Sequence, residues 1–201
     1  MKTRILAGLA ALTALATPVV AADLSASYGY APQAALPPSW NGFYIGANAG
    51  YGWGSAAGDN PSGMIGGLQA GFNFQAPGSP IVFGVETDFD WSGVAGGAFS
   101  VNYLGTVRGR VGFAAERFLV YATGGLAYGE GQYQVFGLSN SQTSYGWTLG
   151  AGAEYALDRN WSARAEYLYV DLGSSTYGSW VGPASIGYDG SVVRAGVNYR
   201  F

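Results

Sequence analysis

The chain has 201 residues, of which 34 are Gly and 15% are aromatic, and it contains neither Cys nor His. The missing Cys excludes disulfides and thiolate metal sites, and the missing His removes the commonest catalytic base and metal ligand. With 9 basic against 12 acidic residues, and charged residues at only 10%, the composition does not indicate nucleic-acid binding.

The N-terminal 22 residues have the order of a secretory signal. A basic start is followed by the apolar stretch 5–16, by Pro18 and by small residues up to Ala22. A charged region, a short apolar region and a small-residue cleavage site are typical of export signals, and the apolar region is too short for a membrane anchor. We therefore predict that residues 1–22 are a signal peptide cleaved after Ala21 or Ala22, which leaves a mature chain without Lys.

Residues 23–39 are rich in Pro, Ala and Ser and show no hydrophobic period. This composition is typical of an extended linker, so we predict that residues 23–39 form a linker ahead of the folded domain.

From Trp40 onward the dominant signal is an alternation of apolar and polar residues, which predicts strands with two chemically different faces. Eight segments share this pattern: 41–53, 67–75, 81–91, 102–113, 118–128, 146–157, 161–169 and 193–201. Every Pro lies outside these segments, as paired strands require. Short connections (76–80, 114–117, 158–160) alternate with longer predicted loops (54–66, 92–101, 129–145, 170–192). This order predicts an antiparallel up-and-down meander.

The alternation alone leaves open which face points outward, because a soluble lipocalin-like barrel and an outer-membrane barrel differ in that respect. The polar face carries five acidic and five basic residues: Glu86, Asp88, Asp90, Glu154, Glu166, Arg108, Arg110, Arg164, Arg194 and Arg200. Aromatic residues gather at the ends of the apolar faces, as interfacial girdles require. We therefore predict an all-β, eight-stranded antiparallel transmembrane β-barrel over residues 40–201, with an interior network of neutralised charges. Inward glycines would make room for these side chains: Gly46, Gly50, Gly71, Gly84, Gly150, Gly152 and Gly196.

Several segments resemble the outer-membrane immunogenic proteins of alphaproteobacteria, small barrels related to the neisserial opacity proteins. They include WNGFYIG at 40–46, FGVETDF at 83–89, LGTVRGRVG at 104–112 and EYLYVD at 166–171. The resemblance implies an eight-stranded barrel in the cell outer membrane, loops on the cell surface, a periplasmic N-terminus, and roles in envelope integrity and host contact. Some members are described as haem-binding, but this chain has neither His nor Cys, which leaves Tyr as the weak alternative ligand, and we expect no cofactor and no metal.

The C-terminal residues invite two compatible interpretations. Tyr199 and Phe201 lie on the apolar face of the last segment, where they would simply meet lipid. The terminal Phe201 also resembles the signal that the outer-membrane assembly machinery reads. We expect both to hold, and we therefore predict that machinery as a partner.

Three function classes remain to be weighed. The leading hypothesis is a non-enzymatic integral outer-membrane surface protein. The alternative is a narrow porin-like channel for small solutes, lined by the inward charges. An enzyme is disfavoured because no His is present and pairs such as Glu86 with Asp88 are better explained as structural ion pairs.

The predicted loops contain Asp59, Glu130, Asp171 and Asp189 but neither Arg nor Lys. These are either ordinary solvated loop residues or groups that share divalent cations with lipopolysaccharide phosphates, since hard cations prefer oxygen ligands. The expected partners are therefore outer-membrane lipid and lipopolysaccharide, the assembly machinery and host surface molecules, with no nucleic acid.

Overall fold

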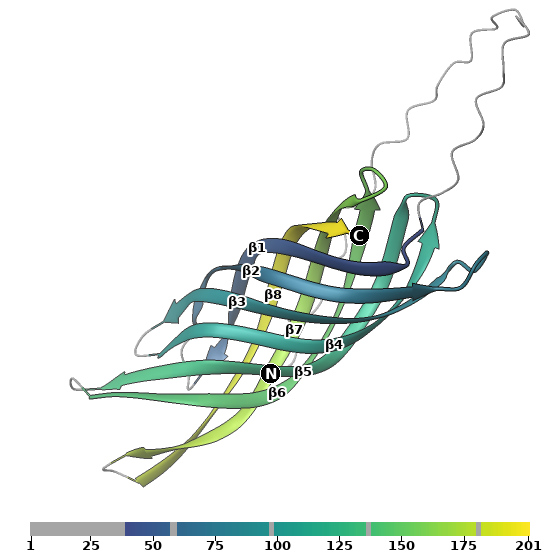
Figure 1. Cartoon of the computed structure of the whole chain (residues 1–201). Coiled ribbons are helices and arrows are strands. Elements are labelled where there is room, and N and C mark those ends of the chain that lie inside the picture. The colour runs from purple at the N-terminus through teal and green to yellow at the C-terminus, as the bar shows by residue number, and fades with distance from the viewer. Residues whose placement is uncertain (1–38, 57–59, 97–98, 136–137, 180–181) are drawn as a thin grey trace, which may run out of the picture. The chain divides into compact units, whose positions relative to one another are not determined.

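A computed structural model describes residues 39–201 except 57–59, 97–98, 136–137 and 180–181 (Figure 1). Its strands are β1 (Gly42–Ala56), β2 (Ser62–Gln75), β3 (Ile81–Gly96), β4 (Phe99–Ala115), β5 (Phe118–Val135), β6 (Leu138–Ala156), β7 (Trp161–Ser179) and β8 (Gly182–Arg200). Within these ranges no helix is long and apolar enough to cross a membrane. The predicted signal peptide and nearly all of the predicted linker lie outside the described residues.

The eight strands form one closed antiparallel barrel in which each strand pairs with its neighbours in the chain. Closure is made by β1 and β8, whose register runs from Tyr44 opposite Arg200 to Ala56 opposite Tyr188. The predicted eight-stranded up-and-down barrel is confirmed. We refer to the side of the three short connections as the turn end, and to the opposite side as the loop end.

The predicted long loops are wrong in extent, because most of their residues belong to strands. Pairing of β5 with β6 continues to Val135 opposite Leu138, and pairing of β7 with β8 continues to Ser179 opposite Gly182. The alternation failed to mark these parts because they are rich in Gly, Ser and other polar residues. Hydrogen bonding between strands does not require an apolar face, so the hairpins extend beyond the apolar part of the wall.

The outer face of the barrel is apolar. Two examples are Leu126, which is 70% exposed, and Phe43, which is 67% exposed. Its aromatic residues form contacts near both ends, such as Phe118 with Tyr155 at the turn end and Trp147 with Tyr169 at the loop end. Between Trp147 and Tyr155 the strand rises about 27 Å at about 3.4 Å per residue. A tilt of about 40° reduces this to about 21 Å, close to the apolar band of a transmembrane barrel.

The interior of the barrel has three layers along its axis. A small apolar cluster at the turn end contains Trp40, Val82, Leu119, Tyr121 and Ala156. Charged side chains fill the middle. The apolar layer at the loop end contains Ile65, Val94, Val101, Leu104, Ala127, Leu168, Val170, Leu172 and Val192, none more than 6% exposed. The inward charges are therefore concentrated in the central part, with Arg200 beside the turn-end cluster.

Candidate functional site

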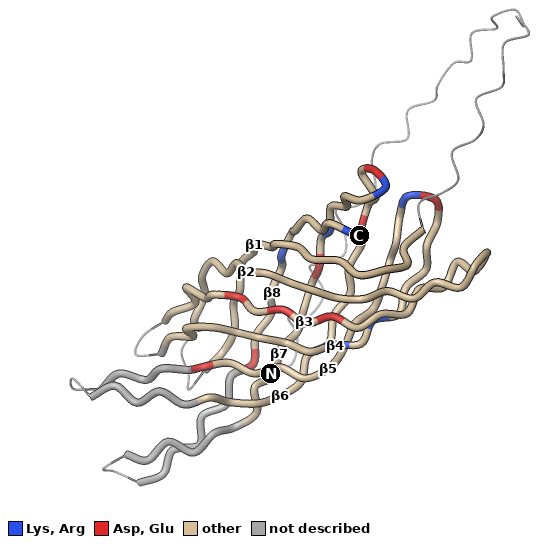
Figure 2. Tube along the Cα trace, viewed as in Figure 1, with Lys and Arg blue, Asp and Glu red and all other residues tan. Residues whose placement is uncertain are grey.

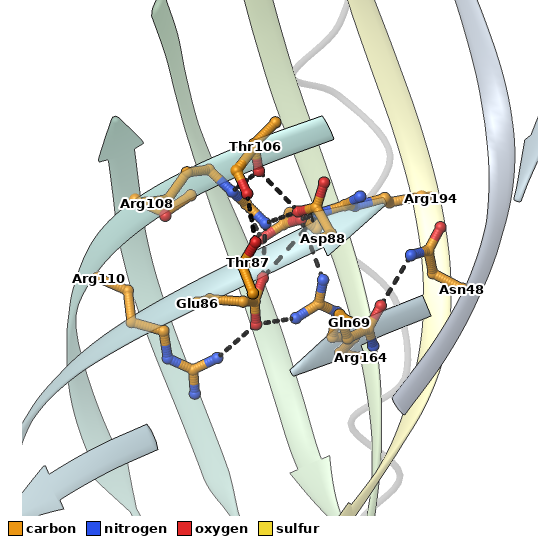
Figure 3. A network of polar contacts seen from close by, with 12 residues as sticks. Asn48, Gln69, Glu86, Thr87, Asp88, Thr106, Arg108, Arg110, Arg164 and Arg194 are labelled. Carbon is orange, nitrogen blue, oxygen red and sulfur yellow. Dashed lines mark hydrogen bonds and ion pairs between the residues drawn. The ribbon is translucent and has the colours of Figure 1, made fainter. Parts of the chain in front are cut away.

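The structure places all ten charged residues predicted for the interior inside the barrel, each at most 5% exposed. Nine of them connect through ion pairs and are called the ionic layer below: Glu86, Asp88, Asp90, Arg108, Arg110, Glu154, Arg164, Glu166 and Arg194. Figure 2 shows the row of acidic residues along β3, and Figure 3 shows how arginines from neighbouring and opposite strands converge on it.

Strands β3 and β4 build the first half of the ionic layer. Glu86, Asp88 and Asp90 occupy every second position of β3, so the strand period directs all three into the barrel. Arg108 and Arg110 do the same on β4, and Arg108 lies directly opposite Glu86 in the register. The pair formed by Glu86 and Arg108 is thus neutralised as soon as the two strands pair, and the other charges of these strands find partners farther away.

Arg108 of β4 contacts three carboxylates of the ionic layer. Its guanidinium contacts Glu86, lies 2.7 Å from Asp88 and reaches Glu166 of β7 at 3.1 Å. Its Nε donates to the hydroxyl of Thr106 at 2.8 Å. Because the side chain is fully buried, these bonds replace its hydration, as a buried charge requires.

Arg194 has the corresponding role on β8. Its guanidinium nitrogens lie 2.8 Å from Asp88, 2.7 Å from Asp90 and 2.7 Å from Glu166. Residues from β3, β7 and β8 are thus held together across the interior. Arg194 of β8 thus neutralises carboxylates of β3, a strand far from it in the sequence.

Arg164 and Arg110 complete the ionic layer toward the turn end. Arg164 donates to Glu86 and lies 3.4 Å from Glu166. Arg110 lies 3.2 Å from Glu154 and 3.6 Å from Glu86. Glu86 therefore contacts arginines of both β4 and β7.

Arg200 is inside the barrel but makes no ion pair in the part that the structure describes. Its guanidinium lies 5.0 Å from the ring centre of Trp40, a cation–π arrangement, and donates to the Arg159 carbonyl at 3.3 Å. The expectation of five acids neutralised by five arginines thus holds for only four of the arginines.

Tyr44 and Tyr121 fall on the polar face of their alternating segments, but their part in the charge network was not predicted. The hydroxyl of Tyr44 donates to Glu86, and that of Tyr121 donates to Glu166 at 3.0 Å. The two rings lie 5.3 and 4.6 Å from the Arg110 guanidinium carbon. The sequence signal that could have indicated this role is an aromatic residue with a hydroxyl group on a face that otherwise carries charges. Five other polar residues of this face hydrogen-bond within or beside the network, a role that was not predicted: Asn48, Gln69, Thr106, Ser162 and Asn198.

Two of the predicted space-making glycines explain how these tyrosines fit. A Cβ on Gly71 would collide with the hydroxyl end of Tyr44, its cross-strand neighbour. A Cβ on Gly152 would collide with the same part of Tyr121, again a cross-strand neighbour. Tyrosine rings thus lie over glycines inside the barrel, and this lets them reach the carboxylates.

The arrangement limits what the ionic layer can do chemically. Its carboxylates are buried and engaged by arginine, so none is presented to a solvent-borne substrate. Among the described residues, no group of three or more acidic side chains has the geometry of a metal site. The layer is therefore suited to holding strands together.

The C-terminal aromatic residues lie on the outer surface at the turn end. Tyr199 contacts the rings of Trp161 and Phe201 at 5.2 and 5.3 Å between ring centres. Phe201 is 71% exposed, and its N–H donates to the Phe43 carbonyl at 3.0 Å. The terminus thus joins the last strand to the first while presenting its side chain outward.

This barrel, with an apolar exterior and a charged interior, can be compared with known proteins. Residues 7–201 match the family model of the outer membrane protein beta-barrel domain. The chain belongs to this family. This barrel protein is 38% identical to the 31 kDa outer-membrane immunogenic protein of Brucella melitensis, in an alignment covering 100% of both chains. It is also 38% identical to the 22 kDa outer membrane protein of Rhizobium leguminosarum bv. viciae, over 85% of this chain and 83% of that protein.

A solved structure extends the likeness in fold. The crystal structure of neisserial surface protein A matches with a TM-score of 0.57 at 20% identity, covering 79% of this chain and 97% of the other. Family membership places this barrel protein in the cell outer membrane, so its apolar wall faces lipid. The predicted family, the predicted location in the outer membrane and the predicted outward-facing apolar surface are confirmed.

Proposed function

We propose that the protein is a non-enzymatic surface anchor: a stable barrel that supports envelope integrity and presents its loop end to the cell exterior for contact with host molecules. The observation that supports this proposal is the filled interior, in which the ionic layer lies between two apolar clusters. An eight-stranded barrel has room inside only for side chains, so a tightly packed lumen favours an anchor over a channel.

The apolar layer at the loop end is the strongest argument against the channel. Leu104, Leu168 and Val192 are among its buried members, and no charged residue belongs to it. An ion entering from outside would have to leave water for this layer before reaching any charge, which is costly. The absence of catalysis is proposed on similar grounds, since the chain lacks His and Cys and its inward carboxylates are paired.

The proposed domain organisation follows from the order of segments. Residues 1–22 serve as a signal peptide, 23–39 as a periplasmic linker and 40–201 as the barrel domain. The start of β1 at Gly42 and the fully buried Trp40 support the last boundary. N-terminal sequencing of the protein isolated from outer membranes tests the first, with Ala22 or Asp23 expected as the first residue.

The proposed partners act at opposite ends. At the turn end, the assembly machinery would recognise the exposed Phe201 together with Tyr199. At the loop end, Asp171 and Asp189 are direct cross-strand partners on β7 and β8, a position in which two like charges repel. A divalent cation shared with lipopolysaccharide phosphates would relieve this repulsion. Glu130 accepts from the Asn102 side chain at 3.2 Å, and Asp59 lies outside the described residues.

Conductance of the purified protein in a planar lipid bilayer tests the central proposal. We expect no stable single-channel steps. Reproducible steps that disappear when the protein is omitted would establish the channel instead. A variant with Leu104→Ser and Leu168→Ser is the matched positive probe, because it makes the apolar layer polar without touching the ionic layer.

Envelope permeability tests the cation bridge separately. A deletion strain carrying the wild-type gene or the Asp171→Asn, Asp189→Asn variant is assayed for dye uptake with and without excess magnesium. We expect higher uptake for the variant, reduced by magnesium in the wild type more than in the variant. Equal uptake and equal magnesium response would remove the cation bridge from the proposal.

A further inference from the structure

At the loop end the barrel wall divides into two separate hairpins. Pairing between β6 and β7 begins at Trp147 opposite Asp171 and is present only from there toward the turn end, within the residues whose backbone the structure describes. The β5–β6 and β7–β8 pairings continue well past this point. Figure 1 shows the two hairpins diverging beyond the closed part of the wall.

A local irregularity in β7 accounts for the division. The register between β7 and β8 shifts between Asp171 and Ser174, and Gly173 lies there at a φ of 40°. Such a bulge bends its strand and ends pairing on one side. The Asp171 carboxylate accepts from the Gly173 N–H at 2.9 Å and so stabilises the bend.

The division creates two strand edges that face each other without pairing. We define the β6 edge as residues 138–143 and the β7 edge as residues 174–179, each roughly 20 Å long at about 3.3 Å per residue. An edge presents a row of backbone N–H and C=O groups that can pair with another chain. Proteins commonly protect such edges with Lys or Pro, and neither edge contains Lys, Arg or Pro.

The charge around the two edges is entirely acidic. Asp171 lies at the point of division, Asp189 is its cross-strand partner and Glu130 lies on the neighbouring hairpin. Segments 129–145 and 170–192, which carry both edges, contain no Arg and no Lys. An incoming strand with basic side chains would therefore find both unpaired backbone groups and uncompensated carboxylates.

We propose that the space between the two hairpins binds an extended cationic polypeptide segment, which adds a strand to the β6 edge or the β7 edge. Main-chain hydrogen bonds hold the segment, and its alternate basic side chains lie near Asp171, Asp189 and Glu130. The proposal rests on the proposed function only in assigning the loop end to the cell exterior, where such a segment from a host molecule would arrive.

Binding is measured with the folded mature protein in lipid nanodiscs. The probe is a synthetic peptide of alternating Lys and Thr, about ten residues long, which spans about 30 Å as a strand. One control peptide has the same sequence with alternate amides N-methylated, which retains the charge and prevents strand addition. A second control replaces Lys by Glu. We expect the first peptide to bind at least about tenfold more tightly than either control.

Two protein variants locate the site. Asp171→Asn with Asp189→Asn keeps an acceptor for the Gly173 N–H and removes both charges, so we expect affinity to fall by roughly tenfold. Asp158→Asn, at the turn end, is the matched control and should leave affinity unchanged. Equal binding of the N-methylated peptide would overturn strand addition in favour of charge alone. Self-association of the protein that is insensitive to peptide would assign the edges to a second copy instead. Peptide binding does not require a closed lumen. A failure to bind would therefore count against the edge proposal alone, whereas a positive conductance result would count against the proposed function.

Discussion

The closed wall and the two projecting hairpins are built from the same strands but differ in how completely their strands pair. In the closed wall every strand pairs on both sides, from β1 with β2 around to β8 with β1. Beyond Trp147 and Asp171 the described backbone contains no further β6–β7 pairing, while the hairpins continue. Lipid offers no partner for an unpaired N–H or C=O, so closure is obligatory there, whereas water can satisfy open edges.

The charged residues inside the closed wall and those at its loop-end rim differ in how they are neutralised. Within the closed wall, charges are tolerated because arginines such as Arg108 and Arg194 each contact several carboxylates. At its loop-end rim, Asp171 and Asp189 are cross-strand partners with no cationic residue in their segments. Buried charges must be neutralised within the protein, but exposed ones can be neutralised by ions or partners.

The largest effect is expected from Arg108→Leu in the ionic layer. The variant leaves Glu86, Asp88 and Glu166 with one fewer cation, and breaking a buried pair costs about 3–5 kcal/mol. Urea unfolding in detergent or lipid, followed by tryptophan fluorescence, measures the loss. The control is Arg117→Leu at an exposed turn, where we expect almost no change. Equal urea midpoints for both variants would contradict the stabilising role of the ionic layer.

A smaller effect is expected from Gly71→Ala. The added Cβ would collide with Tyr44 and with the Val85 carbonyl, and overpacking of this kind costs about 1–3 kcal/mol. The same urea titration applies. Gly109→Ala is the matched control, since the nearest atom to its Cβ would be 4.0 Å away, and it should be nearly neutral. Similar losses in both would indicate a backbone effect without a role for the tyrosine contact.

Shortening the β7–β8 hairpin should matter still less. Replacing residues 175–186 by Asn-Gly joins Ser174 to Gly187, which are cross-strand partners, through a two-residue turn. Because the removed part lies outside the closed wall, we expect the free energy of unfolding to change by less than about 0.5 kcal/mol. A larger loss would mean that the projecting hairpin supports the barrel.

The smallest effect concerns the pH dependence at the turn end. The N–H groups of Trp161 and Asn160 donate to Asp158, and these bonds hold the pKa of its carboxyl below the ordinary value. A lowered pKa in the folded state contributes stability above the ordinary Asp pKa, and this stability is lost as pH falls through the lowered value. The difference in urea midpoint between wild type and Asp158→Asn should therefore be present at neutral pH and disappear in acid. A constant difference would exclude the ionised carboxylate as its source.

Alternation along the chain was enough to predict the eight strands, and the connection lengths predicted their antiparallel order. The face that meets lipid was predicted from the clustered charges on the polar face and the aromatic residues at the ends of the apolar face. The charged members of the interior were also predictable, because a strand period of two places Glu86, Asp88 and Asp90 on one side whatever the tertiary details. What the pattern could not predict is which arginine meets which acid. Arg194 reaches Asp90 although 104 positions separate them, and Arg200 lies over Trp40 away from the ion pairs.

Strand length and the open edges also depended on tertiary structure. Apolar alternation records contact with lipid, so it ends where the lipid ends, although β5 and β6 remain hydrogen-bonded as far as Val135 and Leu138. The bulge at Gly173 that separates the hairpins has no signature in hydrophobicity, since a register shift alters backbone pairing and leaves composition unchanged. Local periodicity reports the environment of each face, whereas the pairing partners of a charge or an edge are decided only when the barrel closes.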